Sequence, residues 1–300
     1  MGNVVVLGVF VADTAYRADR MPRMGETVLG NSFSLGPGGK GSNQAVAAGR
    51  LGADVAMISR LGQDDFVEMA LNTWKAAGVT PYVTQSPDDY TGAAYIFIEH
   101  ATGDNAIIIA PGAAANISAQ DLEDHADLIA AADVFVTQLE QPLSAAQRGL
   151  ELAKAAGVIT ILNPAPAVEL PAEMLALCDY VTPNETETEI LTGMPVTNEA
   201  EAAQAAAALH QMGVKTPIIT LGEKGAYLHG HGLIPAFSVG EVVETTGAGD
   251  AFNGGFAAAL SEGFTPVEAV RIGSATAGIS VTRAGTAPAM PSRAEVDALL

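Results

Sequence analysis

The chain has 300 residues, of which 49% are hydrophobic and 16% are charged, a balance typical of a globular protein and unlike that of a disordered chain. Its formal net charge of −20 argues against nucleic-acid or anionic-membrane binding, because both need clustered lysine and arginine. The single cysteine, Cys178, excludes a disulfide framework and a cysteine-based zinc site. The N-terminal apolar run has no basic segment before it and is far shorter than the ~20 residues of a membrane span, so we expect a cytoplasmic protein.

Short β-branched segments alternate along the chain with alanine-rich segments. The β-branched segments are mostly apolar throughout, as in strands covered on both faces, and predict strands at Val4–Phe10, Asp54–Ser59, Val134–Thr137, Val158–Leu162, Tyr180–Thr182 and Pro217–Leu221. The alanine-rich segments predict helices near residues 42–52, 64–77, 119–131, 144–156, 198–212, 248–262 and 266–282. Strands that alternate with helices form parallel sheets through right-handed crossovers. We therefore expect a doubly wound α/β architecture.

Two segments, residues 11–37 and 89–112, interrupt this alternation. They contain glycine-rich turns and no helical pattern, and they predict short strands at Thr27–Leu29, Ala93–Glu99 and Ala106–Ile109. We expect these segments to form a small β-sheet beside an α/β core made of residues 1–10, 38–88 and 113–300. Such a sheet would serve as a lid over a site or as a dimer interface.

The most informative motif is the run from Glu244 to Asp250, in which Gly247, Ala248 and Gly249 lead into a helix. Small side chains let backbone N–H groups approach a ligand, and the helix start adds positive partial charge. Both features suit the negative charge that develops on a transferred phosphoryl group. Asp250 would then accept a proton from an attacking hydroxyl. An ordinary turn with Asp250 as the helix cap explains the same residues equally well.

A second glycine-rich stretch runs from Gly36 to Gln44. Its glycines match a dinucleotide-binding pattern, but they do not follow the first strand of a βαβ unit. Lys40 is followed by glycine rather than by serine or threonine, which excludes a P-loop. One cation and two amides among glycines suit a polyhydroxylated or anionic ligand, with Lys40 and Asn43 as the contacts. The alternative is a flexible loop with Ser42 as a helix cap.

Polar residues also follow several of the predicted strands. Asn184 and Glu187 have the spacing of a helix capping box, which explains them without a ligand. In the functional alternative, Asn184 lies near phosphate and Glu187 near Mg²⁺ through water. Asp13 and Glu140 each follow an apolar strand, where α/β sheets bind ligands. The histidines show no metal-ligand spacing.

Taken in chain order, these motifs resemble the ribokinase branch of the PfkB carbohydrate kinases. The first family signature is similar to Gly38–Ala45, and the second is similar to Glu244–Gly255. Between them, four further segments fall in family order: Gln138–Glu140, Asn163–Pro166, Thr182–Glu187 and Thr220–Gly225. The resemblance implies a ribokinase-like three-layer α/β/α fold, with a mostly parallel doubly wound sheet and a small β-sheet lid. It also implies ATP-dependent phosphorylation of the terminal (5-) hydroxyl of a pentose, with ribose as the first candidate.

The resemblance assigns roles to individual residues. Asp250 would be the catalytic base, with the backbone of Gly247, Ala248 and Gly249 as the anion hole. The sugar would contact Val11, Asp13, Gly39, Lys40, Asn43, Glu140 and Asp250. ATP would contact Asn184, Thr220, Gly222, Lys224, Gly225, Gly249 and Ser274. Glu187 would hold Mg²⁺ through water, and a K⁺ ion would be held by Glu244, Thr246, Ser280, Arg283 and Gly285. The lid would also pair two subunits into a homodimer.

Two positions depart from the family pattern. Val11 stands where ribokinases typically have Asn, two residues before Asp13, and valine cannot hydrogen-bond a sugar hydroxyl. It therefore favours a sugar that lacks or displaces that hydroxyl, such as 2-deoxyribose; a ketose such as fructose and 2-keto-3-deoxygluconate are further alternatives. Glu244 stands where the second signature usually begins with Asp, which makes K⁺ binding an open question. From other classes, a catalytically silent sugar-binding protein and a dinucleotide oxidoreductase remain alternatives.

Overall fold

The computed structural model describes residues 2–300, so Met1, which belongs to the predicted core range, lies outside the described residues. The central strand is β1 (Asn3–Leu7). Val4 and Val6 pack into one hydrophobic cluster, whereas Val5 and Leu7 pack into another. Because successive side chains of a strand point to opposite faces, this apolar run buries both faces of the sheet.

Within residues 2–300 the main sheet has nine strands, in the order β13-β12-β11-β10-β9-β8-β1-β4-β5. The strands from β5 to β11 pair in parallel, and β12 and β13 add an antiparallel edge. The predicted mostly parallel sheet is therefore confirmed. The bounds are β4 (Asp54–Leu61), β5 (Val79–Gln85), β8 (Val134–Thr137), β9 (Ile159–Leu162), β10 (Tyr180–Val181), β11 (Thr216–Thr220), β12 (Ala226–Leu228) and β13 (Gly232–Ile234).

Helices cover both faces of this sheet, which gives three layers. One hydrophobic cluster joins the sheet to α1 (Lys40–Arg50), α2 (Asp65–Ala76), α9 (Ala248–Ser261) and α10 (Pro266–Ser280). A second cluster joins the other face to α3 (Ala119–Glu123), α4 (Ala126–Ala130), α5 (Leu143–Ala155), α6 (Ala172–Leu175) and α8 (Glu199–Gln211). The remaining helices are α7 (Glu185–Thr192) and α11 (Arg293–Asp297).

Glycines allow α9 to pack closely between its neighbours. A Cβ atom at Gly254 would lie 2.4 Å from the Ala47 side chain on α1, and one at Gly255 would lie 2.5 Å from the Thr276 hydroxyl on α10. Because such distances are far below van der Waals contact, these two positions require glycine. The close packing fixes where the first turn of α9 stands relative to α1.

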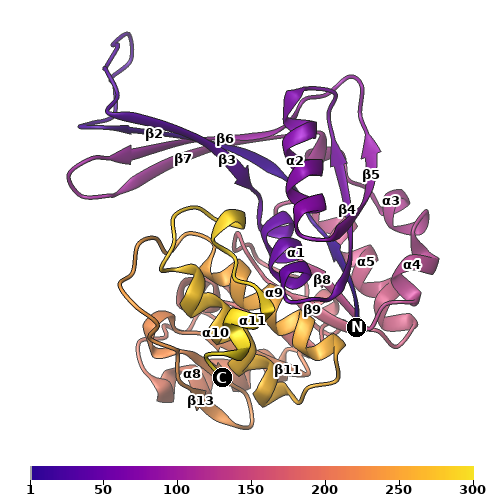
Figure 1. The fold of residues 1–300 in the computed structure, drawn as a ribbon. Coiled ribbons are helices and arrows are strands. Elements are labelled where there is room, and N and C mark those ends of the chain that lie inside the picture. Colours follow the sequence, from indigo (N-terminus) through magenta and orange to yellow (C-terminus); the bar gives the residue numbers. More distant parts are fainter. Residues whose placement is uncertain (1) are drawn as a thin grey trace.

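A second sheet stands apart from the main one, in the order β3-β2-β6-β7. Figure 1 shows it as a long arm that projects from the core above α9 and α10. Its β2–β6 pair is parallel and its other pairs are antiparallel. Apart from Gly38, which the prediction placed in the core, the strands fall within the two segments that interrupt the α/β pattern: β2 (Val11–Ala18), β3 (Ser32–Gly38), β6 (Thr91–Glu99) and β7 (Asn105–Gly112).

Several predicted boundaries are wrong. The segment Thr27–Leu29 is an irregular connection between β2 and β3, and Leu29 is 91% exposed, so no neighbouring strand covers it. The predicted strand Val4–Phe10 ends at Leu7, because the chain then leaves the main sheet for the second one while still buried. The predicted helix 119–131 is divided into α3 and α4.

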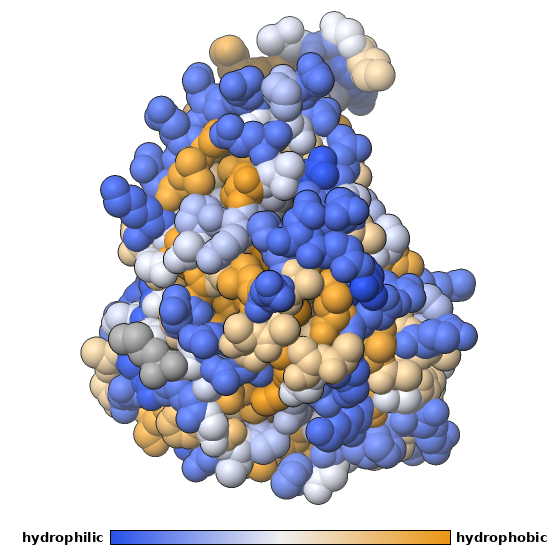
Figure 2. All heavy atoms as spheres, turned by 90° about the vertical axis from the view of Figure 1, so that its right-hand side faces the viewer, coloured by the Kyte–Doolittle hydropathy of each residue, from blue (hydrophilic) through white to orange (hydrophobic). Residues whose placement is uncertain are grey.

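The exterior of the core carries both polar and apolar side chains. The face seen in Figure 2 interleaves polar side chains with smaller apolar areas. No helix among residues 2–300 is long and apolar enough to cross a membrane.

Candidate active site

Polar residues gather at the carboxyl ends of the central parallel strands. Gln138 and Glu140 follow β8, Asn163 follows β9, Thr182 follows β10, and Thr220 ends β11. The N-termini of α1 and α9 lie at the same edge, since Lys40 donates its backbone N–H to Glu140 Oε2 over 2.8 Å. This edge is where open α/β sheets bind ligands.

The turn before α9 has the conformation expected of an anion-binding helix start. Gly247 has φ of 82° and is the N-cap, a left-handed conformation that favours glycine. The Ala248 N–H donates to the Thr245 carbonyl over 3.2 Å, whereas a Cβ at Gly249 would meet no atom within 4 Å. The open side of this turn therefore faces a cavity. The alternative of Asp250 as helix cap is wrong, because Asp250 is the third residue of α9.

Asp250 is held by two amide side chains from α1. Asn43 Nδ2 donates to Asp250 Oδ2 and Gln44 Nε2 donates to Asp250 Oδ1, each over 3.0 Å. The carboxyl group is 6% exposed, and its burial raises its pKa, while Lys40 and the two amides act in the opposite direction. The alternative of Ser42 as the cap of α1 is wrong: the helix begins after Gly39, and the Ser42 hydroxyl accepts a hydrogen bond from Trp74.

Two further carboxyl groups, Asp13 and Glu140, interact with the charge of Asp250. Burial, followed by the charges of Asp250 and Glu244, raises the pKa of Asp13 to about 6. Burial also raises the pKa of Glu140 to about 7, although Lys40 opposes the shift. For Lys40 itself, burial would lower the pKa, but the charges of Asp250, Glu140 and Glu187 outweigh it and raise the pKa.

The first strand of the second sheet brings Asp13 to this cluster. Asp13 lies against Gly38, where a Cβ would be 2.1 Å from the carboxylate. Val11 is 4% exposed and lies two residues before Asp13, so both side chains point to the same face of β2. Gly39 has φ of 89°, and a Cβ there would lie 2.5 Å from the Val9 carbonyl. The predicted sugar contacts therefore neighbour one another, and among them Lys40 and Asp250 line the smaller cavity.

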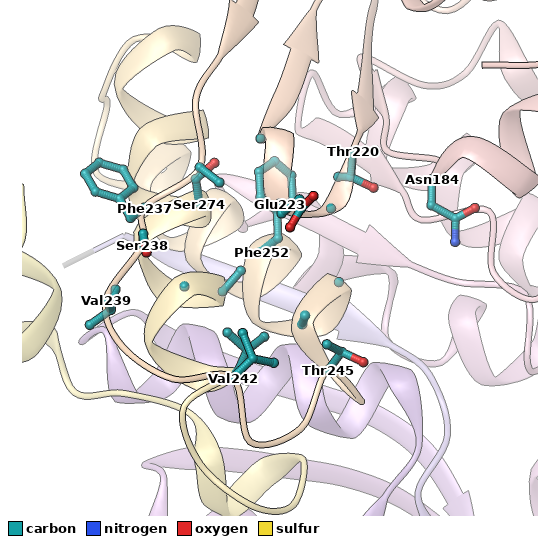
Figure 3. Close-up of a pocket in the computed structure, with 18 of the residues that line it drawn as sticks. Asn184, Thr220, Glu223, Phe237, Ser238, Val239, Val242, Thr245, Phe252 and Ser274 are labelled. Atoms are coloured by element: carbon teal, nitrogen blue, oxygen red, sulfur yellow. The ribbon is translucent and has the colours of Figure 1, made fainter. Parts of the chain in front are cut away.

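A larger cavity of ≈ 620 Å³ opens beside the N-terminus of α9. Figure 3 shows Phe237 and Val239 at one end of it and Asn184 at the other. A smaller cavity of ≈ 150 Å³ is lined by Lys40, Asp250 and Glu187. The two cavities share Asn184, Thr220 and Gly249, so a ligand in the larger one reaches toward Asp250. The larger volume suits a small organic ligand.

Most of the predicted nucleotide contacts line the larger cavity: Asn184, Thr220, Gly222, Gly225, Gly249 and Ser274. Lys224 is the exception. Its ammonium group donates to the Thr197 carbonyl over 2.9 Å and does not line the cavity. The side chain is exposed and reaches the loop before α8 instead.

The capping box at the start of α7 forms as expected. Asn184 Oδ1 accepts from the Glu187 N–H over 2.8 Å, and Glu187 Oε2 accepts from the Asn184 N–H over 2.9 Å. Burial raises the pKa of Glu187. Its carboxylate nevertheless lines the smaller cavity, so the capping and the ligand interpretations are compatible.

The predicted K⁺ residues come from two neighbouring segments. Glu244 Oε2 accepts from the Gly285 N–H over 2.8 Å, and the Glu244 N–H donates to the Val281 carbonyl. The Ser280 hydroxyl donates to the Ala277 carbonyl, and the Arg283 guanidinium pairs with Glu295. Thr246 is exposed on the turn that leads to Gly247. No cluster of three or more acidic, histidine or cysteine side chains that would hold a metal occurs among the described residues.

Comparison with known proteins identifies the family. The profile of the pfkB family carbohydrate kinases matches residues 1–293. The chain belongs to this family. It is 41% identical over 297 residues to a ribokinase of Haemophilus influenzae, which covers 98% of this chain and 96% of that protein. A deoxyribokinase of Salmonella typhi is 37% identical over 299 residues, covering 97% of this chain and 96% of that protein.

A solved structure of Arabidopsis thaliana ribokinase complexed with ribose and ATP has the same fold. Its TM-score is 0.95 at 32% identity, and the match covers 99% of this chain and 98% of that chain. The expected ribokinase-like fold and the expected carbohydrate kinase activity of a pfkB family member are therefore confirmed. The family comparison supports neither of the two alternatives from other classes, a catalytically silent sugar-binding protein and a dinucleotide oxidoreductase.

A buried hydrogen-bond network beside the smaller cavity was not predicted from the sequence. It runs through Gln138, Gln44, Asn163, Thr182 and Asn253, and it ends on the Gly249 carbonyl. All five side chains are 6% exposed or less. The sequence offered one signal for this network, namely that amide and hydroxyl residues directly follow several buried strands. Their mutual bonding depends on strand order, which local sequence does not contain.

Proposed function

We propose that the chain transfers the γ-phosphoryl group of ATP to the terminal hydroxyl of a pentose, with ribose as the first candidate. The observation that carries the proposal is the position of Asp250, which lines the smaller cavity at the N-terminus of α9, next to Gly249, a residue that both cavities share. The relatives named as ribokinases and the neighbour complexed with ribose and ATP support this choice of substrates.

The proposed step is an in-line displacement. Asp250 accepts the proton of the sugar hydroxyl, the hydroxyl oxygen forms a bond to the γ-phosphorus, and the bond between that phosphorus and the β,γ-bridging oxygen breaks. ADP leaves, and the proton passes from Asp250 to solvent. The N–H groups before α9 and the Lys40 ammonium stabilise the negative charge on the phosphoryl oxygens. Asp13, Asn43 and Glu140 orient the sugar, which is where most of the rate gain arises.

Glu187 fits a role in binding Mg²⁺. Its carboxylate lines the smaller cavity, and only one of its oxygens is used in the capping box. A single carboxylate together with nucleotide phosphates is the donor set that Mg²⁺ usually takes, with water completing its shell. When bound, the ion neutralises charge on the phosphates.

Potassium binding is proposed at Glu244, Thr246, Ser280, Arg283 and Gly285. One oxygen of the Glu244 carboxylate accepts the Gly285 N–H, and the other has no bonded partner among the described residues. Hydroxyl, carbonyl and carboxylate oxygens are the donors such a cation takes. Activity measured in potassium should exceed activity in an equal concentration of tetramethylammonium; equal rates would contradict the assignment.

A second candidate substrate is 2-deoxyribose. The observation that favours it is Val11, which is buried beside Asp13 and offers no hydrogen bond to a sugar hydroxyl. A relative named deoxyribokinase, 37% identical, supports the same alternative.

We also propose that residues 11–37 and 89–112 act as a lid that excludes water from the reaction, and that this lid pairs two copies of the chain. Tyr16 pairs with Phe33 and Thr14 with Leu35 across β2 and β3, on the opposite face from Asp13. Phe33 is 57% exposed and Ile108 is 66% exposed on that uncovered sheet. Contiguous exposed apolar side chains of this kind mark a protein interface.

The function is tested by measuring ADP release across a panel of ribose, 2-deoxyribose, fructose and 2-keto-3-deoxygluconate. Ribose or 2-deoxyribose should give the highest kcat/KM. Asp250→Asn should lower kcat by about 10²–10⁴-fold, the range of a general base. Absence of ADP release with every sugar, or full activity in Asp250→Asn, would refute the proposal.

A further inference from the structure

The orientation of Asp250 depends on a side chain that no proposed sugar or nucleotide contact includes. Gln44 is 1% exposed and lies on the first turns of α1, behind Asp250 as seen from the cavities. Its Nε2 donates both to Asp250 Oδ1 over 3.0 Å and to Asn163 Oδ1 over 3.1 Å. Its Oε1 accepts from Gln138 Nε2 over 2.7 Å. Gln44 lines neither cavity.

We infer that Gln44 is a positioning residue for Asp250, which fixes the plane of the carboxylate and keeps it ionised before the sugar binds. The inference rests on the proposed role of Asp250 as the base. Three partners from β8, β9 and α9 hold the Gln44 amide, so neither its rotamer nor its donor end is free to change.

The geometry leaves Asp250 able to act as a base. Each carboxylate oxygen takes one amide donor, from Asn43 or Gln44, and a carboxylate oxygen can accept a second hydrogen bond. The remaining lone pairs are available for the sugar hydroxyl. Because buried carboxylates otherwise tend to protonate, donors to the charged form are needed to keep the base competent.

The charged groups around Asp250 come from four other elements. Lys40 at the start of α1 favours its ionised form, whereas Asp13 on β2, Glu140 after β8 and Glu187 on α7 oppose it. The acidic groups outnumber the single cation. Lys40 alone does not balance these acidic groups. The amide of Gln44, which does not titrate, therefore adds to the stabilisation of the ionised Asp250 carboxylate.

The test compares variants of Gln44 with a matched buried glutamine. Gln44→Met removes both donated hydrogen bonds while keeping the length of the side chain, and Gln44→Glu keeps the shape but replaces the donor with an acidic group. Gln141→Met is the control, because Gln141 is 4% exposed and bonds Thr137 and the Gln138 carbonyl without touching Asp250.

In a plot of kcat against pH, the acidic limb is the range in which kcat falls as the pH is lowered. We expect the apparent pKa of this limb to rise by about one unit in Gln44→Met, the equivalent of one hydrogen bond to a charged group. In Gln44→Glu it should move further, although this variant is closest in shape to the natural residue. KM for the sugar should stay within about twofold, since Gln44 does not face the cavities. The Gln141→Met profile should coincide with that of the natural protein.

A limb that is unchanged in Gln44→Met, or that moves equally in Gln141→Met, would overturn the inference. So would a smaller effect in Gln44→Glu than in Gln44→Met, which is the order that a role in packing predicts. If Asp250→Asn keeps its activity, the proposed function fails instead, so the two failures are distinguishable.

A measurement on the natural chain covers the case in which the variants do not fold. In protein labelled with ¹⁵N at glutamine side chains, one buried amide should shift with pH in the absence of sugar and nucleotide. That shift should disappear in Asp250→Asn. If no glutamine amide behaves in this way, Gln44 does not sense the charge of Asp250 and the inference is wrong.

Discussion

At the scale of single residues, the site concentrates like charges around one cation. Asp13, Glu140 and Asp250 all have pKa values raised first by burial, and Glu140 and Asp250 lie near Lys40. Such an arrangement costs stability in the folded protein, because ionised carboxylates repel one another in a site with little water. It is the kind of perturbed cluster found at functional sites.

The pKa of Glu140 is about 7 in the folded chain, against an ordinary value of 4.5 in the unfolded chain, and this difference makes the stability of the fold depend on pH. The carboxyl group of Glu140 binds its proton more tightly in the folded state than in the unfolded state. The protonated group therefore contributes its full stabilisation below pH 4.5, and this stabilisation is lost as the pH rises through 7. Glu140→Gln should therefore raise Tm at pH 8, by a stabilisation on the order of 1 kcal/mol because Lys40 offsets part of the effect. Thermal unfolding at pH 8 and pH 5 checks this: the gain should shrink at pH 5, and a gain independent of pH would be evidence against it.

Val11 is the residue at which sugar choice can be changed. Its side chain shares a face of β2 with Asp13, so an amide there would point toward the sugar. We expect Val11→Asn to raise kcat/KM for ribose relative to 2-deoxyribose by roughly tenfold, since a buried unpaired hydroxyl costs about 1–3 kcal/mol. The measurement is the ratio of kcat/KM for the two sugars. Val11→Ala is the control, and a ratio that changes equally in both variants contradicts the role of hydrogen bonding.

At the scale of elements, one hydrogen bond joins the second sheet to the segment after α10, which packs against the turn before α9. The Thr286 hydroxyl donates to the Pro37 carbonyl near the end of β3 over 2.9 Å. The same side chain packs on Gly247, where a Cβ would lie 3.3 Å from Thr286 Cβ. Thr286 therefore touches both the arm and the proposed anion hole.

Thr286→Val keeps the shape and removes this hydrogen bond. We expect kcat/KM for the sugar to fall about fivefold, the equivalent of about 1 kcal/mol, while KM for ATP is unchanged. Steady-state kinetics with each substrate varied in turn checks this. Thr282→Val is the matched control, because Thr282 Oγ1 bonds only the Ile279 carbonyl of its own segment. Equal losses in both variants would show that the link to Pro37 is unimportant.

Elements with a periodic pattern and a clear boundary were predictable from the sequence. Asp64 caps α2 at the expected position, and Asn184 caps α7 in the expected capping box. The strand β5 was missed because its residues do not alternate between the buried and the exposed class and because it contains Pro81. The strands β2 and β3 were missed because their register depends on each other and on β6, far away in the chain.

The site was predictable only where a motif is local. Asp250, Lys40 and Asn43 stand in glycine-rich runs whose composition already indicates a ligand. Phe237, Val239 and Val242 line the larger cavity but lie in an irregular segment with no pattern. The turn of Lys224 toward Thr197 depends on how α8 packs beside β11, and the sequence near Lys224 does not encode it.

At the scale of the whole molecule, the exposed apolar face of the second sheet is the basis of the proposed dimer. Phe33→Asp should convert a dimer into a monomer, because a charge buried at the centre of an apolar interface costs several kcal/mol unless it is paired. Sedimentation at several protein concentrations measures this. Leu300→Asp is the control, since Leu300 is 46% exposed but lies at the C-terminus, away from the arm (Figure 1). A monomeric natural chain, or a dimeric Phe33→Asp variant, would disprove the proposed interface.

The net charge of −20 poses a problem for binding a polyanion. The positive character is local: the N-terminus of α9, its preceding N–H groups and Lys40 lie at one edge of the sheet. Surface charges more than about 8 Å away are largely screened at physiological salt. The acidic surface is therefore compatible with nucleotide binding.

The larger cavity is bounded only by the core: none of its lining residues belongs to β2, β3, β6 or β7. The proposed sugar contacts, by contrast, include Val11 and Asp13 on β2. In the proposed arrangement, the nucleotide therefore makes no contact with the projecting sheet, whereas the sugar does. A change in the position of the projecting sheet should therefore alter KM for the sugar more than KM for the nucleotide.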